Sequence, residues 1–187
     1  MSNEELLRVA YRLMATKGMH NMTLQDVADE AGMSKANVVY HYKTKENLVL
    51  TSMEWVLERV AARVAEATAS VSGREAKVKA MIDAIFRDPR RNRTFYVVYA
   101  ELIAHSCRNG RFAEVNRRFR AIVIGEYEAV IRSTDGKSPR TVAREAIVVR
   151  ALIDGLFLQW LEEPDWEERF QEYKDLSVRS ILAFLEG

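Results

Sequence analysis

The sequence has few of the residues that build disulfides, metal sites or tight turns. It contains one cysteine, three histidines, three prolines and eight glycines in 187 residues. A single cysteine, Cys107, excludes an internal disulfide and a thiolate-rich metal site, and no second His or Cys lies at a strong metal-ligand spacing from any histidine. Gly-rich phosphate loops and the G-x-S-x-G and H-E-x-x-H motifs are also missing. We therefore expect no catalytic site, no metal and no cofactor.

Long apolar runs and a strong net charge are absent as well. Stretches such as residues 95–100 are far shorter than the roughly 20 residues of a membrane span. Residues 1–5 include two acids where a signal peptide needs basic residues, so we expect a soluble, cytoplasmic protein that does not enter a membrane. The formal net charge of +1 excludes a histone-like polycation. It does not exclude DNA binding, because the location of the charges decides that.

What the sequence does contain is apolar residues at helical spacing along nearly its whole length, without sustained strand alternation. Capping and breaking residues divide the pattern into nine expected helices. The first ends near residue 17, and the others lie at about 23–32, 34–41, 44–70, 74–86, 92–107, 110–133, 140–161 and 166–185. The strongest loop signal is at residues 134–139. The pattern predicts an all-α protein.

Residues 23–47 are typical of a helix-turn-helix, in which a short turn joins two short helices. Ala28 is small where the helices must approach closely. Gly32 can adopt the left-handed backbone conformation that redirects the chain. Val38 provides an apolar anchor from the third helix back onto the first two. We therefore expect a three-helix DNA-binding domain at residues 1–48 and a second helical domain at 49–187.

The outward side of the third helix carries short, polar or basic residues suited to contacting base edges in a major groove. The candidate DNA-binding residues on this helix are Lys35, Ala36, Asn37, Val39, Tyr40 and His41, preceded by the capping residue Ser34 and followed by Lys43. Thr44 and Lys45 begin the next helix, where backbone N–H groups and an ammonium group favour a DNA phosphate.

This segment resembles the DNA-binding domain of TetR-family transcriptional regulators. The family pattern G-V-S-x-x-x-[LIV]-Y-x-[HY]-F-x-x-K-[ED]-x-L corresponds to residues 32–48, GMSKANVVYHYKTKENL. Val39 stands where the family has a tyrosine, so a contact made by that hydroxyl does not carry over. The resemblance implies that the third helix is the recognition helix and that the fourth connects it to a ligand-binding body. The matched positions with implied DNA contacts are Lys35, Ala36, Tyr40, His41 and Lys45, with Thr23 contacting a phosphate.

The resemblance also implies a homodimer on double-stranded operator DNA. Apolar stripes on the last two helices are the candidate interface: Val149, Leu152, Ile153, Gly155, Leu156, Trp160, Phe170, Tyr173, Ile181 and Phe184. Gly155 inside a helix costs about 1 kcal/mol relative to Ala, which indicates a close backbone approach. The alternative is that these stripes only fill the core of one chain. The run at 151–158 is loosely similar to choline-responsive BetI-type members.

Aromatic and apolar residues of the body are candidates for a small-molecule effector site. They are Trp55, Phe86, Tyr96, Tyr99, Ile103, His105, Phe119 and Phe157. The alternative is again a plain core, because aromatic residues at helical spacing more often pack against one another. The expected function is a ligand-responsive repressor that leaves its operator when the effector binds. A helical small-molecule binding protein without DNA-binding activity is the alternative.

The charges of the body are unevenly distributed. Residues 87–120 contain nine arginines and three acids, whereas residues 162–175 contain seven acids and two basic residues. The arginines could bind an anionic effector such as a coenzyme A thioester, because guanidinium groups suit phosphate and carboxylate. Alternatively, the arginines form a solvated face that pairs with the acidic segment. From the sequence we favour this second interpretation.

Overall fold

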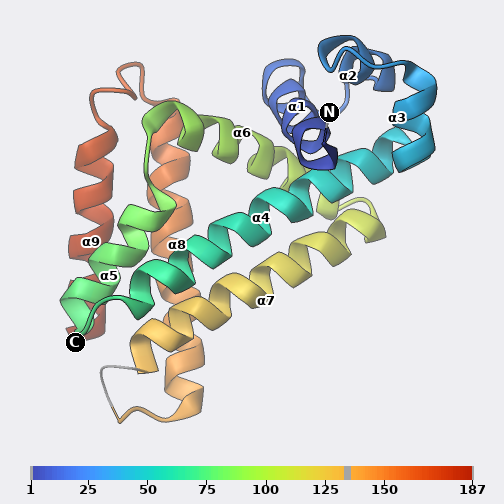
Figure 1. Cartoon of the computed structure of the whole chain (residues 1–187). Helices are drawn as coiled ribbons and strands as arrows, with labels where there is room; N and C mark the ends of the chain where they lie inside the picture. Colours follow the sequence, from blue (N-terminus) through green and yellow to red (C-terminus); the bar gives the residue numbers. More distant parts are fainter. Residues whose placement is uncertain (1, 133–135, 187) are drawn as a thin grey trace. The chain divides into compact units, whose positions relative to one another are not determined.

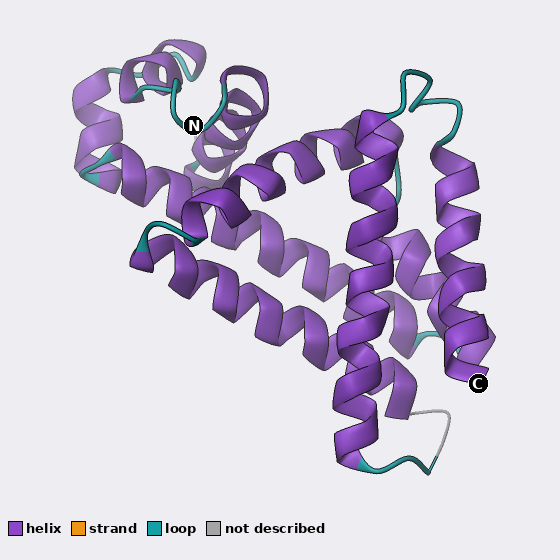
Figure 2. Ribbon diagram, turned by 180° about the vertical axis from the view of Figure 1, so that it is seen from behind, coloured by secondary structure: helices purple, strands orange, loops and turns teal. Residues whose placement is uncertain are grey.

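The computed structural model describes residues 2–132 and 136–186, and every regular element within them is an α-helix (Figures 1 and 2). The helices of this part of the chain are α1 (Asn3–Lys17), α2 (Leu24–Glu30), α3 (Lys35–Tyr42), α4 (Lys45–Ala69), α5 (Arg74–Ile85), α6 (Pro89–Ser106), α7 (Gly110–Arg132), α8 (Pro139–Glu162) and α9 (Phe170–Glu186). The all-α prediction and its nine helices are confirmed within these ranges. Residue 133, the expected end of α7, and residues 134 and 135 of the expected loop lie outside the described part.

Two helices begin three or four residues away from the start that the sequence pattern predicted. Helix α6 begins at Pro89 instead of 92, because the Asp88 carboxylate accepts a hydrogen bond from the Arg91 N–H at 2.9 Å. Proline suits this first helical position, where its missing N–H is not needed. Helix α9 begins at Phe170 instead of 166. The Trp166 carbonyl accepts a hydrogen bond from the Trp160 indole at 2.6 Å, and residues 164–169 form turns.

Contacts between residues divide the chain into two compact units. The head unit comprises residues 1–58 and 97–119, and the body unit comprises residues 59–96 and 120–187. The head unit therefore contains α1, α2, α3 and parts of α4, α6 and α7. The body unit contains α5, α8, α9 and the remaining parts of those three helices.

The head unit is built on small buried apolar surfaces from each of its short helices. Ala10 and Met14 of α1, Ala28 of α2 and Val38 of α3 are completely buried, and Leu48 of α4 joins them. Short helices are marginal in water, and most of their stability comes from packing an apolar face. The polar residues of α2 and α3 consequently lie on the outside.

The body unit has a core of aromatic rings. Phe86 stacks on Phe157 with ring centroids 3.3 Å apart, and Tyr96 stacks on Phe157 at 5.5 Å. Trp160 and Phe170 extend the cluster edge-on. Helix α9 packs against both α5 and α8. This packing gives the body unit a rigid centre.

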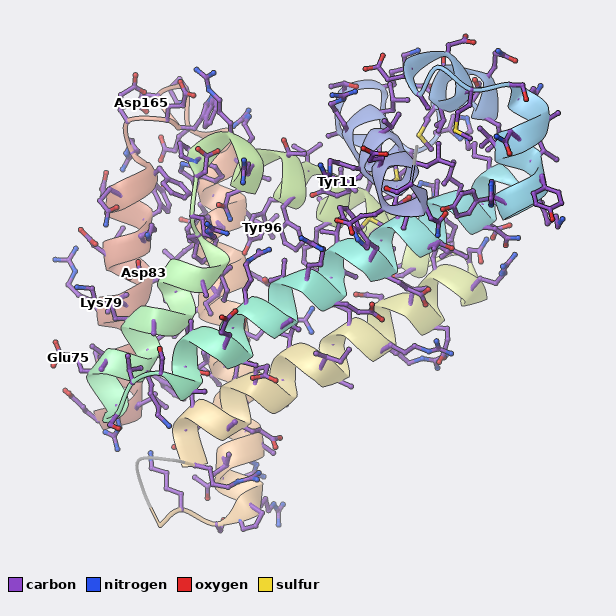
Figure 3. The ribbon with its side chains drawn as sticks, in the orientation of Figure 1. Tyr11, Glu75, Lys79, Asp83, Tyr96 and Asp165 are labelled. Atoms are coloured by element: carbon purple, nitrogen blue, oxygen red, sulfur yellow. The ribbon has the colours of Figure 1, made fainter. Side chains whose placement is uncertain are left out.

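Helix α5 shows how one helix separates core from solvent. Val78, Met81 and Ile82 are buried, with no more than 1% of their surface exposed. Glu75 and Lys79 project from the opposite side (Figure 3). The helix is therefore held by its apolar face, with added polar contacts from Asp83 to Lys174 at 2.8 Å and from Arg74 to the Leu185 carbonyl at 3.3 Å.

We expect Ile82→Ala to lower the free energy of unfolding by about 2–5 kcal/mol, because it removes buried methyl groups and leaves a cavity. Lys79→Ala on the exposed face of α5 should change it by less than about 0.5 kcal/mol. Guanidinium denaturation followed by circular dichroism measures both. Equal losses in the two variants would contradict this assignment of faces.

Candidate DNA-binding site

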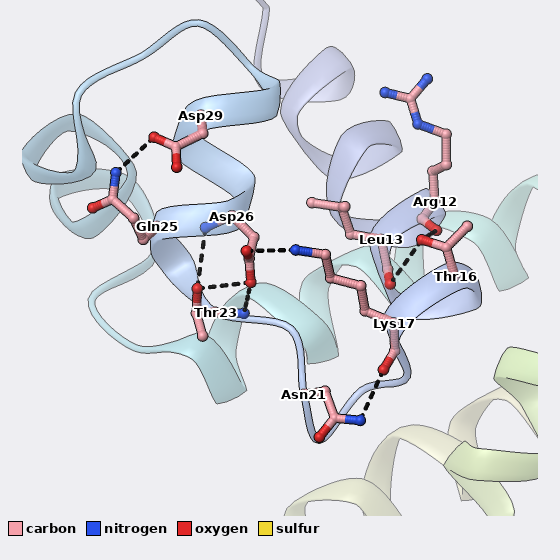
Figure 4. Close-up of polar contacts among 9 residues, drawn as sticks. All are labelled: Arg12, Leu13, Thr16, Lys17, Asn21, Thr23, Gln25, Asp26 and Asp29. Atoms are coloured by element: carbon pink, nitrogen blue, oxygen red, sulfur yellow. Dashed lines mark hydrogen bonds and ion pairs between the residues drawn. The ribbon is translucent and has the colours of Figure 1, made fainter.

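The segment that leads into α2 is held by a network around Asp26 (Figure 4). Thr23 caps the helix: its hydroxyl accepts a hydrogen bond from the Asp26 N–H, and the Asp26 carboxylate accepts from the Thr23 N–H at 2.8 Å. The same carboxylate binds the Lys17 ammonium at 2.6 Å. This reciprocal arrangement is the capping box that the spacing of Thr23 and Asp26 predicted. Lys17 ties it to the end of α1.

Electrostatics favour the ionised form of Asp26. The hydrogen bond from Lys17, followed by those from the side chain and backbone of Thr23, lowers the pKa of Asp26 to about 2. The position near the N-terminus of α2 suits a negative charge, because the helix dipole is positive there. The network is therefore intact at neutral pH and is lost in strong acid.

The turn between α2 and α3 has the geometry of a helix-turn-helix. Gly32 has φ of 63°, in the left-handed region, and a Cβ placed there would meet no atom within 4 Å. Its role is thus conformational rather than a matter of space. The Met33 N–H donates to the Ala28 carbonyl at 2.9 Å, which closes the turn against α2.

Helix α3 is anchored from one side. Ser34 caps it by accepting a hydrogen bond from the Asn37 N–H at 3.2 Å. Val38 is fully buried and Tyr42 is 6% exposed. The Tyr42 hydroxyl donates to the side-chain carbonyl of Asn3, at the start of α1. These contacts fix both the position and the rotation of α3.

The remaining side of α3 is open to solvent. Lys35, Ala36, Asn37, Tyr40 and His41 are exposed, and Tyr40 exposes 72% of its surface. The Lys43 ammonium lies 5.1 Å from the centre of the Tyr40 ring. Among the residues that the structure describes, no carboxylate forms an ion pair with either lysine of this face. The structure thus brings together the expected base-contacting residues, while Val39 is half-buried at the edge of this face.

The link from α3 to α4 is tightly constrained. Lys43 has φ of 64° although it is not glycine, a conformation that costs of order 1–3 kcal/mol. The Thr44 hydroxyl accepts a hydrogen bond from the Asn47 N–H at 3.1 Å and so caps α4. The Lys45 ammonium donates to the His20 carbonyl at 2.5 Å. Lys45 therefore ties α4 to the segment before α2.

The sequence pattern did not reveal the residues that hold this site from a distance. Glu101 of α6 accepts a hydrogen bond from the Met19 N–H at 2.6 Å, and a Cβ on Gly18 would lie 3.1 Å from the Glu101 carboxylate. Arg111 of α7 donates to the side chain of Asn47 at 2.6 Å. These partners are more than sixty positions apart, so no local signal could indicate them.

The candidate dimer residues fall into two groups. Six are buried within a single chain: Val149, Ile153, Trp160, Phe170, Tyr173 and Ile181. Leu152, Gly155 and Leu156 are half-buried, and Phe184 is 37% exposed. Other apolar residues of α8 also reach solvent, namely Ile147, Val148 and Leu158. The six buried residues therefore fill the core of one chain, and only the other four candidates leave part of their surface open.

The candidate effector residues are divided between the two units. Phe86, Tyr96 and Phe157 form the stacked core of the body unit. In the head unit, Tyr99 and Phe119 are buried edge to face, with ring centroids 5.7 Å apart. The other three are less enclosed: Trp55 and His105 are half-buried, and Ile103 is 36% exposed.

The described residues contain no group of three His, Cys, Asp or Glu side chains that could hold a metal ion. No described helix has both the length and the apolar character needed to cross a membrane.

Two protein-family models match the chain. Residues 6–51 match the family of bacterial regulatory proteins, tetR family, and residues 74–183 match the BetI-type transcriptional repressor, C-terminal. The chain belongs to the TetR family. The second match also assigns the C-terminal part to the BetI type, and both confirm the resemblance found in residues 32–48 and 151–158.

Curated TetR-family relatives are transcriptional regulators. The transcriptional repressor KstR2 of Rhodococcus jostii is 26% identical over 137 residues, which cover 72% of this chain and 67% of that protein. The regulator BetI of Agrobacterium fabrum is 24% identical over 163 residues, covering 85% and 76%.

Solved structures share the TetR fold at low sequence identity. A TetR regulator from Haloarcula marismortui has a TM-score of 0.81 at 21% identity, covering 98% of this chain and 95% of that one. A transcriptional regulator from Saccharomonospora viridis, solved in complex with choline, has a TM-score of 0.80 at 20% identity, covering 97% and 93%.

The depressed pKa of Asp26 predicts how acid affects this TetR-family head. A carboxyl group whose pKa is lower in the folded state stabilises that state above its unfolded pKa, and this stability is lost as the pH falls toward the folded value. We expect the contribution of Asp26 to be complete above about pH 4–5 and to disappear as the pH approaches about 2.

Urea denaturation from pH 5 to pH 2 tests this. Wild type should lose more stability over that range than Asp26→Asn. Asp29→Asn is the matched control, since Asp29 lies one turn further along and its side chain bonds Gln25 and no other residue in the described part of the chain. If Asp29→Asn flattened the pH profile as much as Asp26→Asn, the network around Asp26 would not be the cause.

Proposed function

We propose that the protein is a homodimeric repressor that binds operator DNA through α3 and leaves it when a small molecule binds the C-terminal part. The observation that carries this proposal is the two-sided character of α3. Val38 and Tyr42 are buried, whereas Lys35, Asn37 and Tyr40 are exposed without a structural role in the head. Such a helix can enter a major groove and place its side chains against base edges.

The ends of three helices supply groups for the DNA backbone. Thr23, Ser34 and Thr44 cap α2, α3 and α4, and the N-termini of helices favour phosphate. The Thr23 hydroxyl already donates its hydrogen to Asp26, so a phosphate at this helix end would be bound by backbone N–H groups of the first turn of α2. Lys43 and Lys45 add positive charge between the C-terminus of α3 and the N-terminus of α4.

Fluorescence anisotropy with DNA that flanks the gene tests operator binding. We expect one fragment to bind at least about 10³-fold more tightly than a scrambled duplex at physiological salt. Its affinity should fall steeply as salt rises, because phosphate contacts release counterions. Equal binding of all duplexes, or no binding, would support the helical small-molecule binding protein instead.

The residues of the head should divide by role. Lys35→Ala and Asn37→Ala should cost about 1–3 kcal/mol on the operator and relax its preference at particular base pairs. Lys45→Ala should weaken binding to operator and scrambled duplex alike and reduce the salt slope by about one. Anisotropy against single-base operator variants measures both. Uniform loss in all three variants would contradict this division.

Dimerisation through α8 and α9 is supported by Gly155. A Cβ at this position would meet nothing within 4 Å in the single chain, so packing within the chain does not require glycine there. The exposed apolar residues Ile147, Val148 and Leu158 lie on the same helix, and Phe184 lies on α9. Apolar residues gathered on one surface mark a protein interface, and a two-fold dimer suits two recognition helices on one duplex.

Gly155→Lys should therefore convert the dimer to a monomer and weaken operator binding. Gly125→Lys is the matched control, because Gly125 also lies in a helix and has open space around it. Size-exclusion chromatography with light scattering measures the mass. Two monomeric variants, or two dimeric ones, would contradict a role for Gly155 at the interface.

The effector site would involve aromatic residues of the body unit within the BetI-type part, namely Phe86, Tyr96 and Phe157. The choline complex of the Saccharomonospora viridis regulator makes choline the first ligand to test, since aromatic rings bind quaternary ammonium groups. Calorimetry with choline and then a metabolite panel should find a ligand that also releases the operator. If no member of the panel binds, the effector part of the proposal fails while operator binding stands.

A further inference from the structure

The structure separates the arginines of residues 87–120 by their partners. Several are engaged: Arg90 pairs with Glu167, Arg111 with Glu46, and Arg117 and Arg118 with Glu114. Arg93 donates to the Leu161 carbonyl at 3.0 Å. Pairing with the acidic segment, the interpretation favoured from the sequence, thus holds for Arg90. Among the described residues, no ion pair engages Arg87 or Arg91.

The turn between α5 and α6, which lies beside Arg87 and Arg91, is held by a buried asparagine. Asn92 is 6% exposed, and its side-chain oxygen accepts hydrogen bonds from the N–H groups of Arg87 and Asp88 at 3.1 and 3.3 Å. Its amide donates to the Ile85 carbonyl at 2.9 Å. The turn between α5 and α6 is therefore rigid, and the two arginines flank it.

Arg63 of α4 comes to the same turn from another helix. It is half-buried, and its Nε lies 3.5 Å from the Ala84 carbonyl, at the end of α5. Burial lowers the pKa of Arg63, and the positive charges of Arg87, Arg59 and Arg91 lower it further. No carboxylate among the described residues pairs with Arg63. The partly buried guanidinium of Arg63 thus lies near other positively charged arginines.

We propose that Arg63, Arg87 and Arg91 form a binding site for a small anion that carries more than one phosphate-type charge. Guanidinium groups match phosphate oxygens by forming paired, charge-assisted hydrogen bonds. A bound polyanion would relieve the repulsion that this arrangement imposes on the free protein. A single monovalent ion would neutralise too little of the charge.

Helix capping alone does not account for the cluster. A basic side chain near the C-terminus of α5 is favourable, and Arg63 by itself would satisfy that preference. Arg87 and Arg91 do not bond the last carbonyls of α5, and they add repulsion. Asp88 lies between Arg87 and Arg91 in the sequence. Its carboxylate caps α6 by accepting a hydrogen bond from the Arg91 N–H. The cluster is therefore left with net positive charge.

Calorimetry with inorganic pyrophosphate tests the proposal, with sodium chloride added to match ionic strength. Wild type should bind one pyrophosphate per chain, and inorganic phosphate more weakly. Arg87→Ala/Arg91→Ala should weaken pyrophosphate binding by about tenfold or more, because two charge-assisted contacts are lost. Both side chains are exposed, so the variant should keep its circular dichroism spectrum and its Tm without ligand.

The matched control is Arg108→Ala/Arg120→Ala, which removes the same charge from two other exposed positions. This control should bind pyrophosphate like wild type. Equal weakening in both variants would show a general charge effect and overturn the proposal. Failure of wild type to bind would also overturn it. The proposal is also overturned if Arg87→Ala/Arg91→Ala weakens binding to a random duplex but not to pyrophosphate, because the arginines would then contact DNA. Operator selection through α3 is measured separately and is unaffected by any of these results.

Discussion

The anchoring of α3 on one side is the constraint on which the rest of the head depends. Eight residues are too few for a stable isolated helix, so α3 exists only because Val38 and Tyr42 are buried against the other head helices. Once those two positions are committed to packing, helical geometry turns Lys35, Asn37 and Tyr40 outward. The side of α3 that can contact DNA is thus the side that does not pack against the other helices of the head. Any change that loosened the anchor would also disorder the contacts with bases.

Two residues of α6 and α7, distant in the sequence from α1–α4, form hydrogen bonds to the N-terminal part of the head unit. Glu101 binds the Met19 N–H, and Arg111 binds Asn47. Both partners lie within the region that matches the BetI-type C-terminal family, yet both belong to the head unit by contact. Helices α6 and α7 therefore contribute to both units. The hydrogen bond between Glu101 and Met19 thus joins the two family regions within the head unit.

Local patterns were sufficient to predict most of the fold. Caps at Thr23 and Ser34 and the turn at Gly32 depend on neighbouring residues, and they lie where the sequence predicted them. The start of α9 was wrong by four residues, because the Trp160 indole claims the Trp166 carbonyl, a contact that spacing cannot reveal. The periodicity of α8 also did not distinguish residues buried in the core from residues that stay partly exposed. Ile153 and Leu156 occur in the same stripe, but the first is buried in the chain and the second is partly open. The left-handed backbone of Lys43 carried no signal, since neither glycine nor asparagine stands there.

The central claim is that the exposed side of α3 selects a DNA sequence in a two-fold complex. Footprinting of the DNA beside the gene measures this directly. We expect two protected half-sites on one side of the duplex, separated by about one helical turn or a multiple of it. Protection should vanish for Lys35→Ala/Asn37→Ala while the variant keeps its fold. A duplex protected uniformly along its length, or protection that survives the loss of both side chains, would contradict the account.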